Sequence, residues 1–236
     1  MERRMERMAY LGDELELFQH AMNWKSYWSS VVAPYVAGQV LDVGSGLGVN
    51  APFLLNHNVT GYTFLEPDQD LLARTPTSAL PTHIAQRSIA GTTKDLCGER
   101  YDTLAYIDVL EHLADPADEL KRAMNLLTTG GHIVIVVPAF QFLYGPFDKA
   151  IGHFRRYDRR SLRHILPSDA RIIRMRYLDS AGLLLSLGNT LLLRRSTPTS
   201  GQIAFWDRRI VPVSRLSDRL FGYTFGRSLV AILRKG

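Results

Sequence analysis

The segment that most constrains the fold is Val40–Gly48, an apolar run that leads directly into a turn with glycine at positions 44, 46 and 48. We expect a strand over residues 39–43 before this turn and a helix over residues 49–57 after it. Glycine adopts positive φ without steric cost and lets a ligand approach the bare backbone. The helix beyond adds N–H groups that have no partner within the helix. The sequence therefore predicts a ligand-binding turn at the carboxyl end of the first strand.

The spacing of these glycines differs from that of dinucleotide enzymes. Their fingerprint is G-x-G-x-x-G, and starting it at Gly44 would place Val49 at the last glycine. The sequence fits D-x-G-x-G-x-G instead, with Asp42 two residues before the first glycine. This spacing argues against a nicotinamide dehydrogenase.

Short apolar strands alternate with helices along the rest of the chain. Such alternation favours a parallel sheet covered by helices on both faces. No repeat or long linker divides the sequence, so we expect one domain over residues 1–236. The further expected strands are 59–65, 82–86, 101–107, 132–137, 171–178 and 229–233; the expected helices are 13–36, 68–73, 116–127 and 181–220, with a long loop at 139–158.

Acidic residues end or follow three of the expected strands. Glu66 ends the second strand, 24 residues after Asp42, and an acid at that place can accept hydrogen bonds from both ribose hydroxyls of a nucleoside. Asp108 comes directly after the fourth strand. In an open α/β sheet the carboxyl ends of the strands face the ligand crevice, so we expect Asp42, Glu66 and Asp108 to converge on one rim.

These segments resemble motifs I, II and IV of the class I methyltransferases that depend on S-adenosyl-L-methionine (SAM), in matching order over residues 38–138. The stretches 152–157 and 225–230 resemble a bacterial group of small-molecule methyltransferases of type 11/12. The resemblance implies a Rossmann-like α/β fold with a seven-stranded, mostly parallel sheet, an antiparallel last strand and helices on both faces. It also implies SAM as the cofactor.

The resemblance assigns cofactor-binding roles along the rim. Many relatives carry an acid just after the third strand that holds the adenine amino group, and Ser88 stands at the expected position here. Backbone groups near Ser88 and Ile89 are then expected to take over that contact. The expected cofactor-binding residues are Asp42, Gly44, Gly46, Gly48, Glu66, Pro67, Ser88, Ile89 and Asp108.

Methyl transfer to a hydroxyl benefits from a general base, and His112 is our candidate catalytic residue. A structural role for His112, as a cap or packing residue of the helix beginning there, remains open. The main interpretation involves no metal. An alternative is that Asp108, Glu111, His112 and His153 bind a divalent ion that lowers the pKa of the acceptor hydroxyl, because they resemble the ligand set of metal-dependent O-methyltransferases.

The acceptor pocket is expected from three segments: an N-terminal helical lid at 1–37 and insertions at 139–165 and 180–222. Aromatic residues supply apolar walls with polar tips, and arginine can clamp a phosphate or carboxylate. Tyr27 is alternatively a ligand of the SAM carboxylate, and the tryptophans alternatively dock the first helix. The expected acceptor-binding residues are Trp24, Tyr27, Tyr144, His153, Arg156 and Tyr157.

Charge is distributed unevenly along the chain. Residues 1–150 carry a net charge of −7 and residues 151–236 a net charge of +12. The basic third favours an anionic partner: a lipid surface held through residues 181–193 and 208–219, a lipid-linked acceptor, or, less favoured because no RNA-binding module accompanies it, a nucleic acid. The preferred acceptor is a small molecule.

The single cysteine, Cys97, and the lack of a signal-like N-terminus favour a cytoplasmic protein. The oligomeric state stays open.

Overall fold

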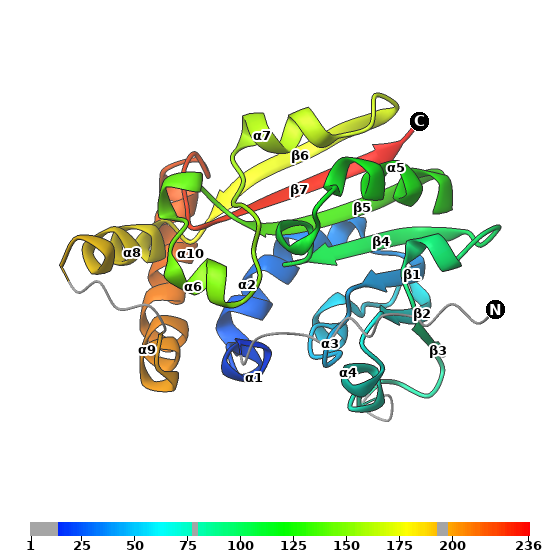
Figure 1. Ribbon diagram of the computed structural model, residues 1–236, viewed down its shortest axis with the longest axis horizontal. Coiled ribbons are helices and arrows are strands. Elements are labelled where there is room, and N and C mark those ends of the chain that lie inside the picture. Colours follow the sequence, from blue (N-terminus) through cyan, green and yellow to red (C-terminus); the bar gives the residue numbers. More distant parts are fainter. Residues whose placement is uncertain (1–13, 77–79, 193–197) are drawn as a thin grey trace, which may run out of the picture.

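Seven strands form one sheet in the part of the chain that the computed structural model describes, residues 14–76, 80–192 and 198–236. Their spatial order is β3-β2-β1-β4-β5-β7-β6 (Figure 1). Neighbouring strands are parallel except at β7, which is antiparallel to both β5 and β6. The strands are β1 Gly38–Val43, β2 Val59–Glu66, β3 Ala85–Ala90, β4 Tyr101–Ile107, β5 Leu127–Pro138, β6 Ala170–Leu178 and β7 Ser228–Lys235. The predicted α/β class and sheet type are confirmed.

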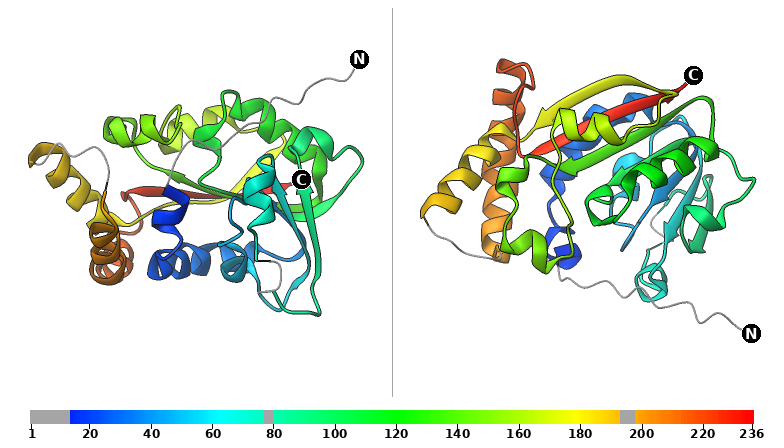
Figure 2. Two further views of the ribbon diagram at one scale, coloured as in Figure 1. Left: turned by 60° about the horizontal axis from the view of Figure 1, so that its bottom comes forward. Right: turned by 45° about the horizontal axis from the view of Figure 1, so that its top comes forward.

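Helices cover both faces of the sheet, as the edge-on view shows (Figure 2, left). Successive residues of a strand point to opposite faces, so each central strand supplies two cores. Val40 and Val134 pack on one face with α2 and α3, whereas Leu41 and Ile133 pack on the other with α5 and α7. The helices are α1 Glu14–Phe18, α2 Met22–Val32, α3 Ala51–Leu54, α4 Gln69–Ala73, α5 Pro116–Leu126, α6 Pro146–Ala150, α7 Arg159–Ile165, α8 Ser180–Leu192, α9 Ser200–Phe205 and α10 Val211–Leu220.

The predicted helix over residues 49–57 was wrong in its length, because α3 ends at Leu54 and Leu55 is extended. Asn56 stops the helix with its side chain. Its amide donates to the carbonyl of Val36 over 2.9 Å, and its oxygen accepts from the backbone N–H of Asn58 over 2.8 Å. Asparagine side chains offer the backbone such alternatives to helical bonding.

The third strand was predicted at 82–86 and instead spans Ala85–Ala90. It lies at the edge of the sheet, where most of its side chains are exposed, so it has no hydrophobic alternation to reveal its bounds. Parallel pairing with β2 fixes its position, with Gly61 opposite Ala85 and Glu66 opposite Ala90.

The predicted N-terminal helix over 13–36 is divided into α1, α2 and a short 3-10 turn at Ala33–Tyr35. Its first residue, Asp13, and the charged segment Met1–Met8 lie outside the described residues. The expected loop at 139–158 contains α6, and a 3-10 turn at Gln141–Leu143 precedes it.

The predicted helical region after β6 consists of α8, α9, a π-helical turn at Trp206–Ile210 and α10. These elements lie together at one end of the molecule (Figure 1, left). The end of the apolar run at Leu193 lies outside the described residues. Where the structure describes the chain, none of the helices has the length and hydropathy needed to span a bilayer.

Candidate active site

The turn after β1 has the conformation that its glycines predict. Gly44, Gly46 and Gly48 have φ of 65°, 54° and 69°. A Cβ at Gly48 would lie 2.5 Å from the Thr75 methyl group, and one at Gly44 would lie 3.0 Å from a Val109 methyl group. Both conformation and space therefore require glycine at these places.

Glu66 ties the end of β2 to this turn. Its carboxylate accepts hydrogen bonds from the backbone N–H groups of Gly46, over 2.8 Å, and Asp68, over 3.0 Å. Burial raises the pKa of Glu66 although these two bonds act in the other direction. Each carboxylate oxygen can accept a further hydrogen bond, so a pair of ligand hydroxyls fits this side chain. Pro67 follows and is exposed.

Two further buried polar side chains belong to the turn and to the strand before it. Asp42 is buried and accepts a hydrogen bond of 2.8 Å from the hydroxyl of Tyr62. Burial raises the pKa of Asp42 to about 7 despite that bond, and the charge of Glu66 adds to the rise. The buried Ser45 hydroxyl has no hydrogen-bond partner among the described residues. A buried polar group of this kind fits a site that a polar ligand completes.

The residues expected to contact adenine lie at a different place in the third strand from the one predicted. Ser88 and Ile89 lie inside β3, whereas the residues next to the end of β2 are Ala90 and Gly91. The premise that Ser88 follows the third strand was therefore wrong, because the strand begins and ends later than predicted. The contact of Ser88 and Ile89 with adenine stays a prediction.

Asp108 begins the segment after β4 and has φ of 55°, in the left-handed region that non-glycine residues seldom adopt. Burial of its carboxyl group raises the pKa of Asp108 to about 6, while the neighbouring His153, Lys25 and Arg227 act in the opposite direction. Such strain in a residue that precedes a cluster of titratable groups is typical of functional sites.

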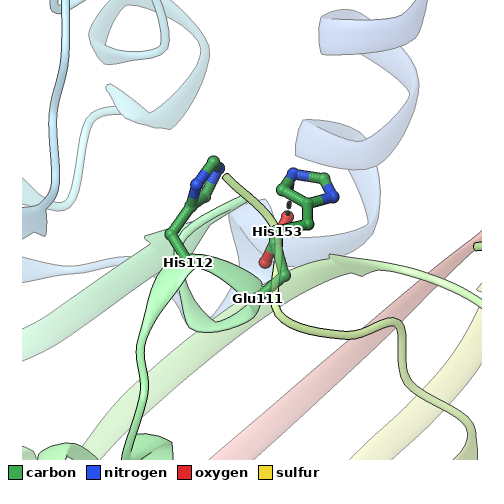
Figure 3. A group of neighbouring side chains, drawn as sticks. All are labelled: Glu111, His112 and His153. Atoms are coloured by element: carbon green, nitrogen blue, oxygen red, sulfur yellow. Dashed lines mark ion pairs between the residues drawn. The ribbon is translucent and has the colours of Figure 1, made fainter. Parts of the chain in front are cut away.

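Glu111, His112 and His153 form a compact group beside this rim (Figure 3). The first two extend from the 3-10 turn Leu110–His112, and His153 comes from the loop after α6. The two imidazole rings lie 4.5 Å apart between centroids, and Nε2 of His153 lies 3.9 Å from Oε1 of Glu111. Atoms of the three side chains that could ligate a metal lie within 4.8 Å of one another.

Burial controls the charges of this group. The Glu111 side chain is 0% exposed, neither carboxylate oxygen has a hydrogen-bond partner among the described residues, and burial raises its pKa well above the usual range. Burial and the neighbouring His153 lower the pKa of His112 to about 4. At neutral pH His112 is therefore a neutral imidazole that can accept a proton.

His153 is oriented by a carboxylate that sequence reasoning missed. Its Nδ1 lies 2.9 Å from Oδ1 of Asp148, and Arg156 donates two hydrogen bonds to the same carboxylate over 2.8 and 3.0 Å. Burial raises the pKa of Asp148, but the hydrogen bonds from His153 and Arg156 bring it down to about 2. The charged Asp148 thus accepts a hydrogen bond from Nδ1–H of His153 and leaves Nε2 directed at Glu111. The sequence does contain one sign of Asp148. Gly145-Pro146 is a pair that favours the start of a helix, and Asp148 then lies in the first turn of that helix.

The remaining residues expected to bind the acceptor make contacts within the protein. Trp24 is buried against Trp206, with ring centroids 5.8 Å apart. The hydroxyl groups of the three tyrosines donate hydrogen bonds within the protein: Tyr27 to Asp218, Tyr144 to the His153 carbonyl and Tyr157 to the Leu110 carbonyl. Tyr157 is 1% exposed, so its ring supports the 3-10 turn from inside the core.

Lys25 is a second residue that sequence reasoning missed, and nothing in its neighbourhood in the sequence marks it. It is buried on α2 and donates hydrogen bonds to the carbonyls of Phe18 and Gln19 over 2.7 and 3.1 Å. Burial lowers its pKa to about 8, while Asp108 and Asp207 act in the opposite direction. The ammonium group is therefore held near the rim in its mostly charged form at neutral pH.

Known proteins resemble the chain in sequence and in fold. A family model described as a methyltransferase domain matches residues 18–169. The ubiquinone biosynthesis O-methyltransferase of Vibrio parahaemolyticus is 31% identical over 98 residues, which are 40% of this chain and 41% of that protein. The match thus spans about two fifths of that relative's length.

Two solved structures show the same fold. A SAM-dependent methyltransferase from Archaeoglobus fulgidus has a TM-score of 0.62 at 15% identity, with 94% of this chain and 97% of that chain covered. The N-methyltransferase NodS of Bradyrhizobium japonicum, solved with S-adenosyl-L-homocysteine (SAH), has a TM-score of 0.55 at 14% identity, with 92% and 87% covered. Together with the glycine turn and the rim acids, the family match identifies the chain as a member of the methyltransferase-domain family, with the fold of class I SAM-dependent methyltransferases.

Proposed function

We propose that the chain transfers the methyl group of SAM to a hydroxyl oxygen of a small-molecule acceptor by in-line displacement. SAM supplies a methyl group activated by its sulfonium centre. The observation that carries the proposal is the position of three features at the carboxyl ends of the adjacent strands β1, β2 and β4: the glycine turn follows β1, Glu66 ends β2, and His112 lies in the turn after β4. The O-methyltransferase among the relatives supports oxygen as the acceptor atom.

The rim residues hold SAM in this proposal. The glycine turn lets SAM approach the backbone closely, and Glu66 and Pro67 face its ribose. Asp42 and Asp108 stabilise its positive charges. The glycine positions and the unpaired Ser45 hydroxyl support this fit. To the expected set we add Lys25, because its buried ammonium group near Asp108 suits the carboxylate of SAM.

His112 takes up the acceptor proton. As the acceptor oxygen bonds to the methyl carbon, the carbon–sulfur bond breaks, its electron pair stays on sulfur, and the hydroxyl proton passes to the imidazole. A neutral imidazole can accept that proton. Most of the acceleration comes from alignment, which can lower such barriers by about 7–11 kcal/mol.

The test of this proposal uses SAM with a labelled methyl group and a panel of hydroxyl-bearing small molecules. His112→Ala should bind SAH as the wild type does but transfer the label roughly a hundredfold to ten-thousandfold more slowly. The matched control is His83→Ala, at an exposed position, which should change neither quantity. Transfer by His112→Ala at the wild-type rate would contradict the assignment.

The acceptor side consists of the lid at 1–37 and the insertions at 139–165 and 180–222. Their described parts contact one another: Asp207 accepts from the backbone of Trp24, Asp218 accepts from Tyr27, and the rings of Phe18 and Phe147 lie 6.5 Å apart between centroids. These contacts support the proposal that the three segments enclose one acceptor.

A metal-assisted form of the reaction has its own supporting observation. Glu111, His112 and His153 offer one carboxylate and two imidazoles, and the two Glu111 oxygens have no protein partner among the described residues. The Asp148 carboxylate behind His153 is the arrangement that orients metal-ligating histidines. Asp108 is not part of this group, so three of the four expected ligands come together. When bound, a divalent ion would lower the pKa of the acceptor hydroxyl.

Metal content separates this form from catalysis by His112 alone. The protein would be incubated with Mn²⁺, desalted and analysed for bound metal, with Glu111→Gln as the variant and exposed Asp169→Asn as its control. Retained metal in the wild type and control, and its loss in Glu111→Gln, would support the metal-assisted form. Equal metal content in all three proteins, with full activity in excess EDTA, would eliminate it.

A second candidate acceptor class is anionic. A groove of about 820 Å³ adjoins the loop after β5, and its lining includes Arg155, Arg160 and Arg163 together with Tyr157 and one acid, Asp158. Arg156 also lines it but is engaged with Asp148. Guanidinium groups in such a groove favour a phosphate-bearing acceptor. Pyrophosphate should then compete with the acceptor in the wild type but not in Arg160→Glu/Arg163→Glu; equal inhibition of both would exclude this class.

A further inference from the structure

Helix α10 has three large apolar residues on its outer side, although Val211 at its start is buried. Val213, Leu216 and Leu220 are 55%, 74% and 79% exposed, whereas Ser214 and Asp218 on the opposite face are 0% exposed. A surface helix of a globular protein normally has the reverse arrangement. The exposed face of α10 is therefore suited to an apolar environment.

The inner face of α10 is held in place by polar contacts, so the helix cannot be rotated without breaking them. Ser214 donates to Asp179 over 2.6 Å. Asp218 accepts from the hydroxyl of Tyr27 and from the backbone N–H groups of Asp179 and Ser180, over 2.7, 2.7 and 2.9 Å. Burying Asp218 without these bonds would be costly, which fixes the outward direction of the leucines.

The exposed apolar surface continues beyond the helix. Phe221 follows α10 and is 49% exposed, and α8, which packs against α10, adds exposed Leu184 and Leu185. These elements lie at one end of the molecule (Figures 1 and 2). We call Val213, Leu216, Leu220 and Phe221 the apolar face of α10.

A cationic groove of about 660 Å³ borders this face and shares Leu216 with it. Its lining includes Arg174, Arg176, Arg215 and Arg219 and, among the residues that the structure describes, no acidic one. Three of these guanidinium groups lie over tyrosine rings that also line the groove. Within the described residues, none of the four arginines forms an ion pair with a carboxylate. The groove is thus a concentration of uncompensated positive charge.

We propose that this end of the molecule docks on the surface of a membrane containing anionic phospholipids. The apolar face of α10 enters the boundary of the acyl chains, and the arginines of the groove bind lipid phosphates. Exposed aliphatic side chains beside basic ones are the combination that interfacial helices use. A nucleic acid would leave the leucines without a partner, and a symmetric dimer through this face would bring the arginines of two copies together.

The experiment is co-sedimentation of the whole protein with vesicles of neutral phosphatidylcholine, with and without anionic phosphatidylglycerol, at low and high salt. The wild type should sediment with the anionic vesicles at low salt, and high salt should release most of it. Arg174→Glu/Arg219→Glu should lower the partition coefficient roughly tenfold or more. The control Arg100→Glu/Lys121→Glu makes the same change of charge at exposed positions outside the groove and should have little effect.

A second variant tests the apolar part. Leu216→Ser/Leu220→Ser changes two exposed side chains, so its thermal melting should match that of the wild type while its binding to anionic vesicles falls. Failure of the wild type to bind anionic vesicles at low salt overturns the proposal, as does equal loss in the control charge variant. Sedimentation velocity that shows a dimer which Leu216→Ser/Leu220→Ser dissociates, without vesicle binding, would assign the face to a second copy instead.

Discussion

Oε2 of Glu66 lies 2.8 Å from the backbone nitrogen of Gly46 and accepts its hydrogen bond. This contact joins the end of β2 to the centre of the glycine turn after β1. It holds the turn in the left-handed conformation in which a side chain at Gly44 or Gly48 would meet Val109 or Thr75. The contact therefore fixes the shape of the turn that we propose binds the cofactor.

Gly48→Ala should weaken SAH binding, because its Cβ would lie 2.5 Å from the methyl group of Thr75 and φ is 69°. Adding Thr75→Ser removes that methyl group but keeps the hydroxyl, which donates to the Gly46 carbonyl. The double variant should recover part of the lost affinity, leaving a backbone cost of about 1–2 kcal/mol. Calorimetric titration with SAH measures both effects, and a double variant no better than Gly48→Ala would refute the steric explanation.

Asp42 should make the wild type less stable as the pH rises. Burial raises its folded-state pKa to about 7, whereas in the unfolded chain it titrates near 4. Between these values the folded state binds more protons, so this contribution to the free energy of unfolding falls as the pH increases and is fully lost above about pH 7.

Asp42→Asn removes this titration. The free energy of unfolding of the variant, minus that of the wild type, should therefore be larger at about pH 8 than at about pH 4. Urea unfolding at the two pH values gives the difference directly. An unchanged difference between the two proteins would show that Asp42 ionises normally in the folded state.

Asp207 should stabilise the helix that covers the rim. Its carboxylate accepts hydrogen bonds from the backbone N–H groups of Asn23 and Trp24 at the start of α2, over 3.2 and 2.8 Å. Asp207→Ala should therefore lower the free energy of unfolding by about 1 kcal/mol or more, and Asp207→Asn by less. Denaturant titration tests this, with exposed Asp169→Ala as the control. Equal stability of Asp207→Ala and the control would argue against a capping role.

Arg156→Lys should disturb His153 without removing a charge. The guanidinium group holds both oxygens of Asp148, and lysine cannot reproduce this two-point contact. The Nδ1 resonance of His153 in nuclear magnetic resonance should move toward that of a histidine without a carboxylate partner, and methyl transfer should slow. Arg155→Lys is the matched control, since Arg155 donates to the Ala114 carbonyl instead. The same shift of the Nδ1 resonance in both variants would show that Arg156 has no specific role in orienting His153.

The sequence predicts the parts of this fold that depend on local patterns. Apolar strands beside helices indicate the sheet, and the glycines and Glu66 indicate the rim. The bounds of β3 were predicted wrongly because an edge strand that is exposed on both faces lacks hydrophobic alternation. Its position depends on pairing with β2. The break before α2 was equally hidden, because its cap, Asp207, is 183 residues away in sequence from Trp24.

The site follows the same division. Glu111 and His112 are adjacent in sequence and could be found together, but their approach to His153 depends on the path of the loop after α6. Asp148 and Lys25 act through burial and distant neighbours, which residue patterns do not encode. The inverted polarity of α10 likewise becomes visible only when the direction of each side chain is known.

The most direct measurement of the central claim, that the rim of β1, β2 and β4 binds the cofactor through Glu66, is isothermal calorimetry with SAH. The wild type should bind one equivalent, and Glu66→Ala should lose affinity by about 1.5–3 kcal/mol, the usual value of hydrogen bonds to a charged group. Glu66→Gln should lie between the two. Undiminished affinity of Glu66→Ala for SAH, or no heat from the folded wild type, would contradict the account.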